Sequence, residues 1–489
     1  MSTHTPNPRD LAAELALGAL SQHGVITSTL ADAYRSAGFT LALVGGPVRD
    51  AILGRLGNDL DFTTSARPAD SVKILKKWGD ALWETGAAFG TIAAKKGEVT
   101  VEVTTYRSES YNPESRKPDV EFGESIEGDL ARRDFTINAM ALELTGEKPI
   151  FIDLFNGAAD LARKMLRTPA SAESSFSDDP LRMMRAARFV AQLDFSVDPE
   201  IILAMTQMAD RLSIISAERI RDELIKTLMS NNPLLGLRLL VETGLAIYFL
   251  PELPKLKLEI DEHHHHKDVY EHTLTVLDQA IVLEDRLGSP NLTIRLAALL
   301  HDIGKPRTRQ LIEGGGVSFH HHEVVGAKMT AKRLKELRFD GDTVNDVSKL
   351  VFLHLRFHGY GSGEWTDSAV RRYIRDAGDL LEHLHVLTRA DCTTRNQRKA
   401  IQLSLTYDSL EARIKELMAQ EELDRIRPDL DGGQIMEILG IKPSRAVGAA
   451  YEYLLELRME KGPLGVDVAR EELLTWARNK EFGASQQDK

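Results

Sequence analysis

The sequence predicts an α/β domain followed by helical domains up to the C-terminus. Three observations support this prediction. Short apolar runs at Phe39–Val44, Thr91–Ala94 and Val99–Thr104 alternate with glycine and polar turns, as in an α/β fold. Apolar residues recur at helical spacing through most of the sequence after Ser177. The length of 489 residues corresponds to about three to five domains of ordinary size.

Changes in these patterns divide the chain into five regions. Apolar residues from Leu11 to Leu20 have helical spacing, and we expect junctions at Thr168-Pro169 with the serine-rich stretch 171–177, and again between Leu250 and Glu262. The regions are N-terminal helices at 1–35, an α/β head at 36–168, a helical neck and body at 169–260, a histidine-rich helical domain at 261–400, and a helical tail at 401–489.

Two local expectations concern loops, and a third concerns the C-terminus. Residues 107–123 are rich in charge, proline and glycine, which indicates a mobile loop. Three glycines at 314–316 separate two short apolar runs, 310–312 and 317–319, and predict a β-hairpin within the helical region. We expect the last eight or so residues to be disordered.

Composition excludes several classes of protein. A single cysteine, Cys392, rules out an intramolecular disulfide and favours a reducing compartment. The net charge of −12 argues against nonspecific polyanion binding, so any nucleic-acid site must be a local basic stripe. The sequence has no apolar run of about 18 residues and no signal-peptide pattern. We therefore expect no membrane partner and a cytoplasmic location.

The segment LALVGGPVRDAILG (41–54) predicts a strand, a Gly-Gly turn and a helix with Pro47 in its first turn. Backbone N–H groups at such a turn suit a phosphate, and Gly45 and Gly46 permit close approach of a ligand to the backbone. Arg49 would add a positive charge. A Gly-Gly pair by itself is equally typical of an ordinary tight turn.

The next segment, NDLDFTT (58–64), predicts a strand whose alternating side chains place Asp59 and Asp61 on one face. Two neighbouring carboxylates repel unless a cation lies between them, so the pair suits Mg²⁺ held against a triphosphate. Glu102 would join them if its strand is a neighbour. The alternative is a solvated strand face without a ligand.

Two further segments offer nucleotide contacts. In RRDFTINAM, which starts at Arg132, Asp134 and Asn138 would share one helix face and read ribose hydroxyls, while Arg133 would hold a phosphate. The alternative for this segment is a surface salt bridge. DDPLRMMRAARF (178–189) places arginines three residues apart along one stripe of a helix, namely Arg182, Arg185 and Arg188. The alternative for the second segment is an N-cap at Asp179 followed by a solvated arginine face.

Histidines and aspartates in the later helical region predict a metal centre. His272, the His301-Asp302 pair and Asp391 lie on three predicted helices and suit a divalent transition metal. A metal-bound hydroxide there could attack a phosphoester. Three more histidines, which could complete a second metal site, are His322, His354 and His358.

Taken together, these motifs resemble the polymerase-beta-type nucleotidyltransferases, and more closely the class II group of bacterial tRNA CCA-adding enzymes and poly(A) polymerases. The resemblance continues through DLFNGAADLARKMLRT (153–168) and ISAERIRDEL (215–224), in the order of the family's motifs. It implies an α/β polymerase-beta-type nucleotidyltransferase head followed by all-helical neck, body, HD and tail domains. The His-Asp pattern resembles that of HD phosphohydrolases and extends the resemblance to about residue 400.

The resemblance implies a role for most of these residues. Asp59, Asp61 and Glu102 would be catalytic, with Mg²⁺ on the two aspartates, and the RRDFTINAM motif would select ribonucleotides. Asp179 and Arg182 would serve as an amino-acid template for CTP and ATP, because a carboxylate accepts from the exocyclic amine that both bases carry. Arg185 and Arg188 would add charge toward phosphate. The family usually has Glu where this chain has Asp178, so the side chain at that position is one carbon shorter.

The implied activity is addition of CCA to the 3′ end of tRNA from CTP and ATP. The segment TGAAFGTIAAKKGEVTVEVTTYR (85–107) resembles the CCA-adding pattern and lacks the basic strand of the poly(A) polymerases. An A-adding enzyme would share the template, so it stays open, as does a poly(A) polymerase. The sequence also leaves open an HD phosphohydrolase with a nucleotide-binding head, and a noncatalytic tRNA-binding module. We expect tRNA as partner, gripped by the tail through its backbone, and no stable protein partner.

Overall fold

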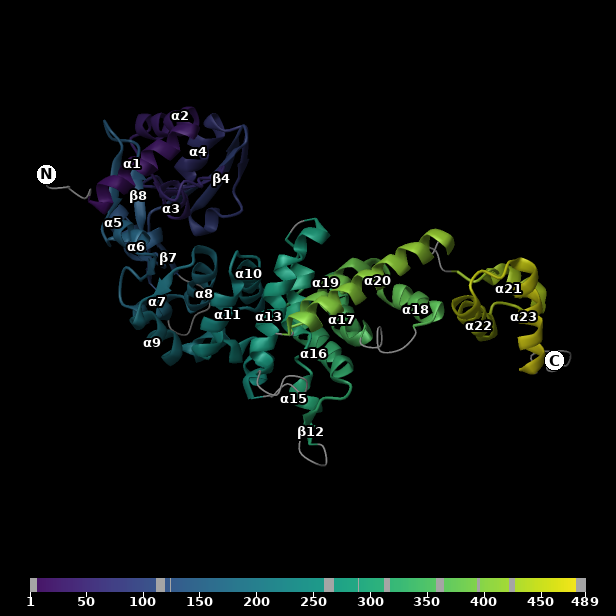
Figure 1. Ribbon diagram of the computed structural model, residues 1–489. Coiled ribbons are helices and arrows are strands. Elements are labelled where there is room, and N and C mark those ends of the chain that lie inside the picture. Colours follow the sequence, from purple (N-terminus) through teal and green to yellow (C-terminus); the bar gives the residue numbers. More distant parts are fainter. Residues whose placement is uncertain are drawn as a thin grey trace. The chain divides into compact units, whose positions relative to one another are not determined.

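The computed structural model describes residues 7–110, 119–123, 125–258, 268–288, 290–311, 317–357, 365–393, 396–421 and 427–480. The chain forms two compact units, residues 1–254 and 255–489 (Figure 1). The boundary lies within the predicted second junction. The finer division into five regions stays a prediction.

A seven-stranded mixed sheet organises the head, in the order β3-β4-β5-β2-β1-β8-β9. Strands β2 and β5 run parallel, and the other neighbouring pairs are antiparallel. The three apolar runs predicted as strands correspond to β1, β4 and β5. The strands of this sheet are β1 (Leu41–Val44), β2 (Asp59–Thr64), β3 (Ala81–Trp83), β4 (Thr91–Lys96), β5 (Val99–Thr105), β8 (Met140–Glu143) and β9 (Ile150–Asp153).

Helices cover this sheet, and the predicted N-terminal helices are among them. Helix α1 (Pro8–Leu20) packs on α3 (Gly46–Ile52), and α2 (Gly24–Ser36) packs on α4 (Pro68–Trp78) and β1. Leu30 and Tyr34 of α2 are completely buried. The N-terminal helices therefore belong to the core of the first unit.

The stretch 107–123, predicted as a mobile loop, contains a β-ladder. Strand β6 (Arg107–Ser110) pairs antiparallel with β7 (Asp119–Phe122), and residues 111–118 between them lie outside the described part. The prediction of a loop is therefore wrong for the two ends. Charge and proline obscured the ladder in the sequence, because the backbone hydrogen bonds that form it do not depend on side-chain hydropathy.

The serine-rich stretch 171–177, predicted as part of a junction, is helical. Helix α7 (Ala172–Asp178) begins after Ser171, whose side chain accepts the N–H of Ser174. Serine is unfavourable inside a helix but strong as a cap, and tertiary packing decides the outcome here. Phe176 of α7 is completely buried.

The rest of the first unit is helical apart from the two-residue parallel ladder of β10 (Met165–Leu166) with β11 (Ser196–Val197). Helix α8 is the centre of this part, since it packs against both α10 and α11. The helices are α8 (Leu181–Leu193), α9 (Pro199–Gln207), α10 (Ala217–Leu228), α11 (Pro233–Glu242) and α12 (Glu252–Lys255).

In the second unit, five helices contact one another around the histidine-rich segments: α13, α14, α16, α17 and α19. The predicted hairpin is confirmed, with β12 (Gln310–Leu311) antiparallel to β13 (Val317–Ser318). The helices are α13 (Val269–Val282), α14 (Leu292–Leu300), α15 (Lys305–Thr308), α16 (His322–Glu336), α17 (Gly341–Leu353), α18 (Asp367–Ala377), α19 (Leu381–Asp391) and α20 (Gln397–Glu421).

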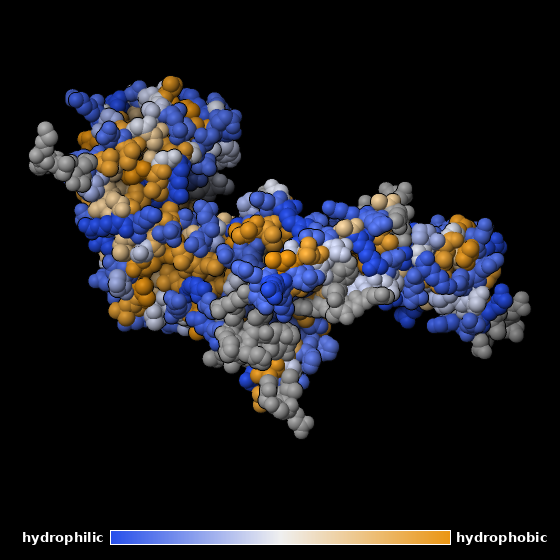
Figure 2. All heavy atoms as spheres, in the orientation of Figure 1, coloured by the Kyte–Doolittle hydropathy of each residue, from blue (hydrophilic) through white to orange (hydrophobic). Residues whose placement is uncertain are grey.

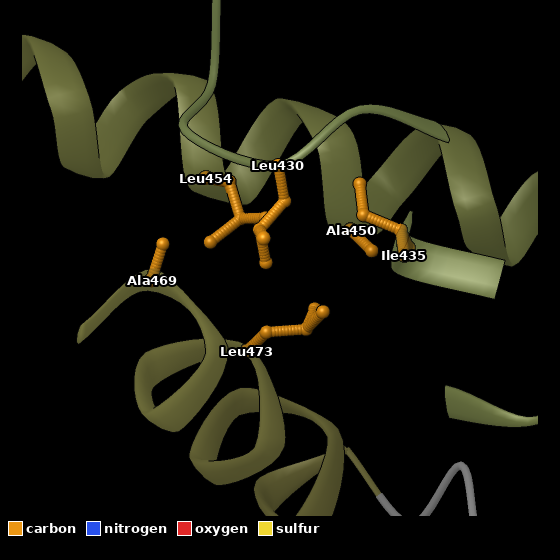
Figure 3. Close-up of a cluster of buried hydrophobic side chains, with 6 residues drawn as sticks. All are labelled: Leu430, Ile435, Ala450, Leu454, Ala469 and Leu473. Carbon is orange, nitrogen blue, oxygen red and sulfur yellow. The ribbon is translucent and has the colours of Figure 1, made fainter. Parts of the chain in front are cut away.

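The described tail has a small core of its own. Helices α21 (Gly432–Leu439), α22 (Arg445–Lys461) and α23 (Val466–Asn479) surround a cluster of buried apolar side chains. Figure 3 shows the six that meet there: Leu430, Ile435, Ala450, Leu454, Ala469 and Leu473. Helix α22 also packs on α18, and Nη1 of the buried Arg371 donates to the carbonyl of Met459 (2.9 Å). The expected disorder of the last residues concerns 481–489, outside the described part.

Hydrophilic and hydrophobic residues are interspersed over the face drawn in Figure 2. Within the described ranges, no helix combines the length and the apolar character needed to cross a membrane.

Candidate active site and candidate metal centre

Three acidic side chains lie on one face of the head sheet. Asp59 and Asp61 of β2 are exposed, whereas Leu60 and Phe62 between and after them are 1% exposed. Glu102 of β5 is directly opposite Asp61 in the parallel register and is also exposed. The predicted shared face and the predicted neighbouring strand are therefore confirmed, because both follow from the two-residue period of a strand.

These carboxylates have the electrostatics of a cation site. Surrounding protein, followed by the Glu102 carboxylate, raises the pKa of Asp61 to about 6, although its side chain keeps contact with solvent. Asp59 also raises the pKa of Asp61, and a divalent cation between the carboxylates would relieve that repulsion. The ligand atoms of Asp59, Asp61 and Glu102 do not all lie within 4.8 Å of one another, so they form a looser set than the residues of the second unit described below.

The Gly-Gly turn begins next to these carboxylates, where β1 ends at Val44. Gly45 has a φ of +76°, a conformation that favours glycine, and α3 begins at Gly46 with Pro47 in its first turn, as predicted. A Cβ atom on Gly45 would lie 2.8 Å from Nη1 of Arg133. The backbone conformation of the turn therefore favours glycine at this position, and the guanidinium of Arg133 lies close to it.

Arg49 lies in a polar network and not in open solvent. Its side chain is buried, and Nη1 donates to Oδ1 of Asn138 (2.6 Å). Nε and Nη2 donate to the carboxylate of Asp50. The charge of Arg49 is thus partly balanced, and its orientation is fixed by the RRDFTINAM segment.

Asp134 and Asn138 are in contact, as the prediction of a shared face requires, but they do not lie on an α-helix. Phe135 is extended, and Thr136–Asn138 form a single 3₁₀ turn. Nδ2 of Asn138 still donates to Oδ1 of Asp134 (3.0 Å). Tertiary hydrogen bonds fix this shape, since Oγ1 of Thr136 donates to Asp160 (2.7 Å).

An ion pair between the buried Asp134 and the partly exposed Arg185 joins the RRDFTINAM segment to helix α8. Nε of Arg185 donates to Oδ2 of Asp134 (2.9 Å), and Nη2 of Arg185 contacts the same oxygen. Burial alone would raise the pKa of Asp134, but Arg185 and the hydrogen bonds from Asn138 and Phe135 hold it well below its usual range. Asp134 is therefore a carboxylate at neutral pH. Because Asp134 is buried, the alternative interpretation of this motif as a surface salt bridge is wrong.

Arg133 and Arg132 share a partner that lies before the RRDFTINAM motif. Asp129 of helix α5 (Ile126–Ala131) is completely buried and pairs with Arg132 (2.9 Å) and Arg133 (3.1 Å). The signal was available, because Asp129 precedes these arginines by three and four residues, the spacing of helical neighbours.

The arginine stripe of α8 is mostly buried, which contradicts a solvated face. Arg182 and Arg188 are each 8% exposed. Nη2 of Arg182 donates to the carbonyl of Arg132 (2.6 Å), and Nη1 donates to Oγ of Ser175 (3.0 Å). Arg188 pairs with Glu223 (3.3 Å), a buried carboxylate of α10 in the ISAERIRDEL motif.

Asp179 and Asp178 precede this helix. Oδ1 of Asp179 accepts the N–H of Leu181 (3.0 Å), so it satisfies the first helical N–H as predicted, although the residue at the cap position is Pro180. Its other oxygen pairs with the exposed Arg219 (2.7 Å). Asp178 approaches Arg182 only to 3.9 Å, which is consistent with its shorter side chain.

In the second unit, the histidines and aspartates form two adjoining groups. The first comprises His272, His301 and Asp391, and the second comprises Asp302, His322 and His354; within each group the ligand atoms lie within 4.8 Å of one another. His322 and His354 therefore join the centre as predicted. His358 lies outside the described residues.

Asp302 links the two groups. Its Oδ2 lies 3.1 Å from Nε2 of His301, and its Oδ1 lies 3.2 Å from Nε2 of His322. Nε2 of His272 lies 3.0 Å from Oδ1 of Asp391. Gly304 allows this arrangement, since a Cβ atom on it would lie 2.2 Å from the carbonyl oxygen of His322.

The outer nitrogens of three histidines fix the rings for metal binding. Nδ1 donates to a backbone carbonyl in His301 (Ala298, 2.8 Å), His322 (Phe319, 2.9 Å) and His354 (Val351, 2.6 Å). Each Nε2 is thereby left as the unprotonated acceptor when the ring is neutral.

The pKa values of two histidines show that the environment of this centre differs strongly from water. Nε2 of His354 is buried without a hydrogen-bond partner, and burial, followed by His301 and His322, lowers the pKa of His354 to about 3. Burial alone would lower the pKa of His301, but Asp302 raises it to about 9. Imidazoles and carboxylates in this arrangement fit divalent transition metals.

Family models match three parts of the chain. Residues 41–167 match the poly A polymerase head domain, and residues 194–256 match the probable RNA and SrmB-binding site of polymerase A. Residues 269–396 match the HD domain. The class defined by fold and site is thus a polymerase-type head with an RNA-binding segment and an HD domain.

Relatives place the chain more narrowly. The A-adding tRNA nucleotidyltransferase of Deinococcus radiodurans is 32% identical over 424 residues, 85% of this chain and 91% of that protein. The chain belongs to the tRNA nucleotidyltransferase family. The CCA-adding enzyme of Levilactobacillus brevis is 42% identical over 226 residues, which cover 46% of this chain and 55% of that enzyme.

A solved structure shares the fold over almost the whole length. The Bacillus stearothermophilus CCA-adding enzyme in complex with CTP superposes with a TM-score of 0.65 at 23% identity, covering 98% of this chain and all of that one. The predicted fold class is confirmed.

Proposed function

We propose that this chain adds C, C and A to the 3′ end of tRNA from CTP and ATP without a nucleic-acid template. The observation that carries the proposal is the carboxylate face of the head, where Glu102 lies opposite Asp61 and Asp59 lies two residues away on the same strand. Acidic side chains on neighbouring strands beside a glycine turn suit nucleotidyl transfer, because they can hold a divalent cation that would offset the negative charge of the triphosphate.

Asp59 and Asp61 are the residues that would hold Mg²⁺, and Glu102 completes the acidic set. When bound, the ion lowers the pKa of the tRNA 3′-hydroxyl and offsets the charge of the triphosphate. The 3′ oxygen attacks the α-phosphorus, the bond from that phosphorus to the bridging oxygen breaks, and pyrophosphate leaves. The raised pKa of Asp61 supports this assignment, because a cation bound beside these carboxylates would stabilise their charged forms.

The triphosphate and ribose would be bound by the groups around the Gly-Gly turn. The backbone at Gly45 and Gly46 permits close approach, and Arg133 lies directly over it. Arg49 donates a hydrogen bond to Asn138, and Asn138 donates one to Asp134. The residues proposed to bind phosphate and those proposed to bind ribose therefore form one hydrogen-bonded network.

Base selection is assigned to Asp179 and Arg182. Arg182 is held by Ser175 and the carbonyl of Arg132, which fixes its guanidinium in a buried position. Asp179 has one oxygen on the exposed Arg219, which a base could displace. UTP and GTP would be rejected, because each presents a carbonyl where CTP and ATP present an amine.

A second candidate is an enzyme that adds only the terminal A. The Deinococcus radiodurans relative, which matches 85% of this chain, is an A-adding enzyme, whereas the CCA-adding relative from Levilactobacillus brevis matches 46%. Both activities would use the same head residues. The two candidates are therefore distinguished by which tRNA transcripts the enzyme extends.

The HD centre supports a second activity on phosphoesters of RNA ends, such as phosphatase or 2′,3′-cyclic phosphodiesterase. The two residue groups joined by Asp302, and the unpartnered Nε2 of His354, support this proposal. The centre would bind divalent metal through imidazole nitrogens and carboxylates, and Lys305, whose Nζ lies 2.9 Å from Asp302, balances the charge of that shared carboxylate.

The test uses purified full-length chain, Mg²⁺ and three tRNA transcripts that end at the discriminator base, at C and at CC. Each transcript is offered CTP, ATP, UTP or GTP, and then CTP with ATP, and the 3′ ends are sequenced. Completion of CCA on all three, with UTP and GTP ignored, is the expected result. Extension of only the CC-ended transcript by one A would favour the A-adding enzyme, and long A tails would contradict both proposals.

A further inference from the structure

The ring of Phe189 lies under three arginines of the first unit. Phe189, on α8, is 3% exposed. The guanidinium carbons lie 5.2 Å (Arg49), 5.7 Å (Arg185) and 4.6 Å (Arg188) from its ring centroid. All three distances are within the range of a cation–π contact.

Each of these arginines also has a polar partner, and Glu223 lies within 3.9 Å of both Arg185 and Arg188. Arg49 donates to Asn138. Arg185 pairs with Asp134, and Arg188 pairs with Glu223. Among these contacts, the Phe189 ring is the one that all three arginines share.

The Phe189 ring offsets part of the repulsion between the three guanidinium groups. Three guanidinium groups gathered in one region repel one another, and burial, followed by Arg185, lowers the pKa of Arg188 to about 10. The negative face of an aromatic ring attracts cations, which a leucine or methionine of similar size cannot do. Phe135 meets the ring edge to face, with centroids 5.5 Å apart and planes at 84°, and so fixes its orientation.

We propose that Phe189 is a positioning residue for the incoming nucleotide, holding Arg49, Arg185 and Arg188 in the orientation in which they face phosphate and support the ribose-reading pair. This inference rests on the proposed function. Phe189 acts through the arginines and does not itself touch the nucleotide.

Base choice should be independent of Phe189. Asp179 and Arg182 are oriented by Arg219, Ser175 and the carbonyl of Arg132, and not by the ring. Loss of the ring should therefore weaken triphosphate binding and relax the ribose check, while rejection of UTP stays intact.

The experiment compares Phe189→Leu and Phe189→Tyr in the full-length chain, with a CC-ended transcript for ATP and a C-ended transcript for CTP. We expect Phe189→Leu to raise KM for both nucleotides about tenfold with a smaller change in kcat, because the loss of several weak contacts adds up. Discrimination against 2′-deoxy nucleotides should fall, and discrimination against UTP should not. Phe189→Tyr, which keeps the ring, should restore KM to nearly the wild-type value.

Phe249→Leu is the matched control, since Phe249 is also 3% exposed and belongs to the same unit. A change in packing alone would lower the fraction of active enzyme, and hence kcat, in both leucine variants. If Phe189→Leu behaves like Phe249→Leu, or if Phe189→Tyr fails to rescue KM, the inference is wrong. Phe189→Met replaces the leucine variant if that variant does not fold. Wild-type chain that incorporates no nucleotide would instead contradict the proposed function.

Discussion

Asp61 and Glu102 face each other across the parallel pair of strands in the head sheet. Asp61 is two residues from Asp59 on the same face, and Glu102 raises the pKa of Asp61. Glu102 is distant from both aspartates in the sequence, and the pairing of β2 with β5 brings it beside them. Glu102 therefore belongs to the acidic site that Asp59 and Asp61 form on β2.

Replacing Glu102 by Gln should weaken nucleotide incorporation without abolishing it. The substitution keeps the shape but removes a negative charge beside Asp61, and loss of a supporting group around a metal site costs about ten- to a hundredfold. Single-turnover incorporation of ATP on a CC-ended transcript, across a Mg²⁺ titration, measures this effect. Glu98→Gln, in the turn before β5, is the control. A Glu102→Gln enzyme with wild-type rate and Mg²⁺ dependence would remove Glu102 from the site.

Replacing Arg182 by Lys should impair the choice of base. Lysine keeps the positive charge but cannot reproduce the planar guanidinium that donates to both Ser175 and the carbonyl of Arg132. We expect the preference for CTP over UTP to fall about tenfold or more, since one correctly placed hydrogen-bonding group contributes about 1–3 kcal/mol of discrimination. Competition assays with mixed nucleotides provide the measurement. Unchanged preference in a folded variant would separate Arg182 from base selection.

The Asp134–Arg185 pair should make stability depend on pH in the acid range. The pKa of Asp134 is lower in the folded chain than in the unfolded chain, so its contribution is complete above the unfolded value of about 4 and is lost as pH falls toward the folded value. Asp134→Asn should therefore destabilise the chain by about 3 kcal/mol at neutral pH and by progressively less below pH of about 4.

Calorimetry of the wild type and the variant from pH 7 to pH 3 tests this expectation. Asp70→Asn, which removes an exposed pair with Lys73, serves as the control and should have little effect at any pH. A difference between Asp134→Asn and wild type that stays constant with pH would show that the pair is not the cause.

Removal of metal should destabilise the second unit and leave the head folded. Dialysis of the full-length chain against a chelator should release divalent ions held by the two groups that Asp302 joins, and the unfolding temperature of that unit should fall. Elemental analysis of wild type and of His354→Gln tests the assignment, with the exposed His320→Gln as control. Equal metal content in His354→Gln and wild type would exclude His354 as a ligand.

The sequence predicted the parts of the site that depend on local period. The alternation of Asp59 and Asp61 with Leu60 and Phe62 follows from strand geometry, and the conformation of Gly45 follows from the turn it must make. The grouping of histidines with aspartates in the second unit was also predictable, because such combinations of residue types that bind metal are uncommon.

What the sequence could not predict depends on tertiary contacts. Asp134 and Asn138 meet in an extended segment and a 3₁₀ turn because Asp160 and the carbonyl of Arg167 hold Thr136. The arginine stripe is buried because α10 supplies Glu223 from a distant part of the sequence. The contacts of the Phe189 ring could not be predicted either, since nothing local shows that an arginine of α3 would reach it.

The central claim is that the carboxylate face of the head transfers nucleotides. The most direct measurement compares the wild-type chain with the Asp59→Asn/Asp61→Asn double variant on a transcript that ends at the discriminator base, with CTP, ATP and Mg²⁺, and with a His301→Gln variant beside them. We predict complete CCA ends for wild type and His301→Gln, and no incorporation by a folded double variant. Incorporation that survives in the double variant would contradict the account.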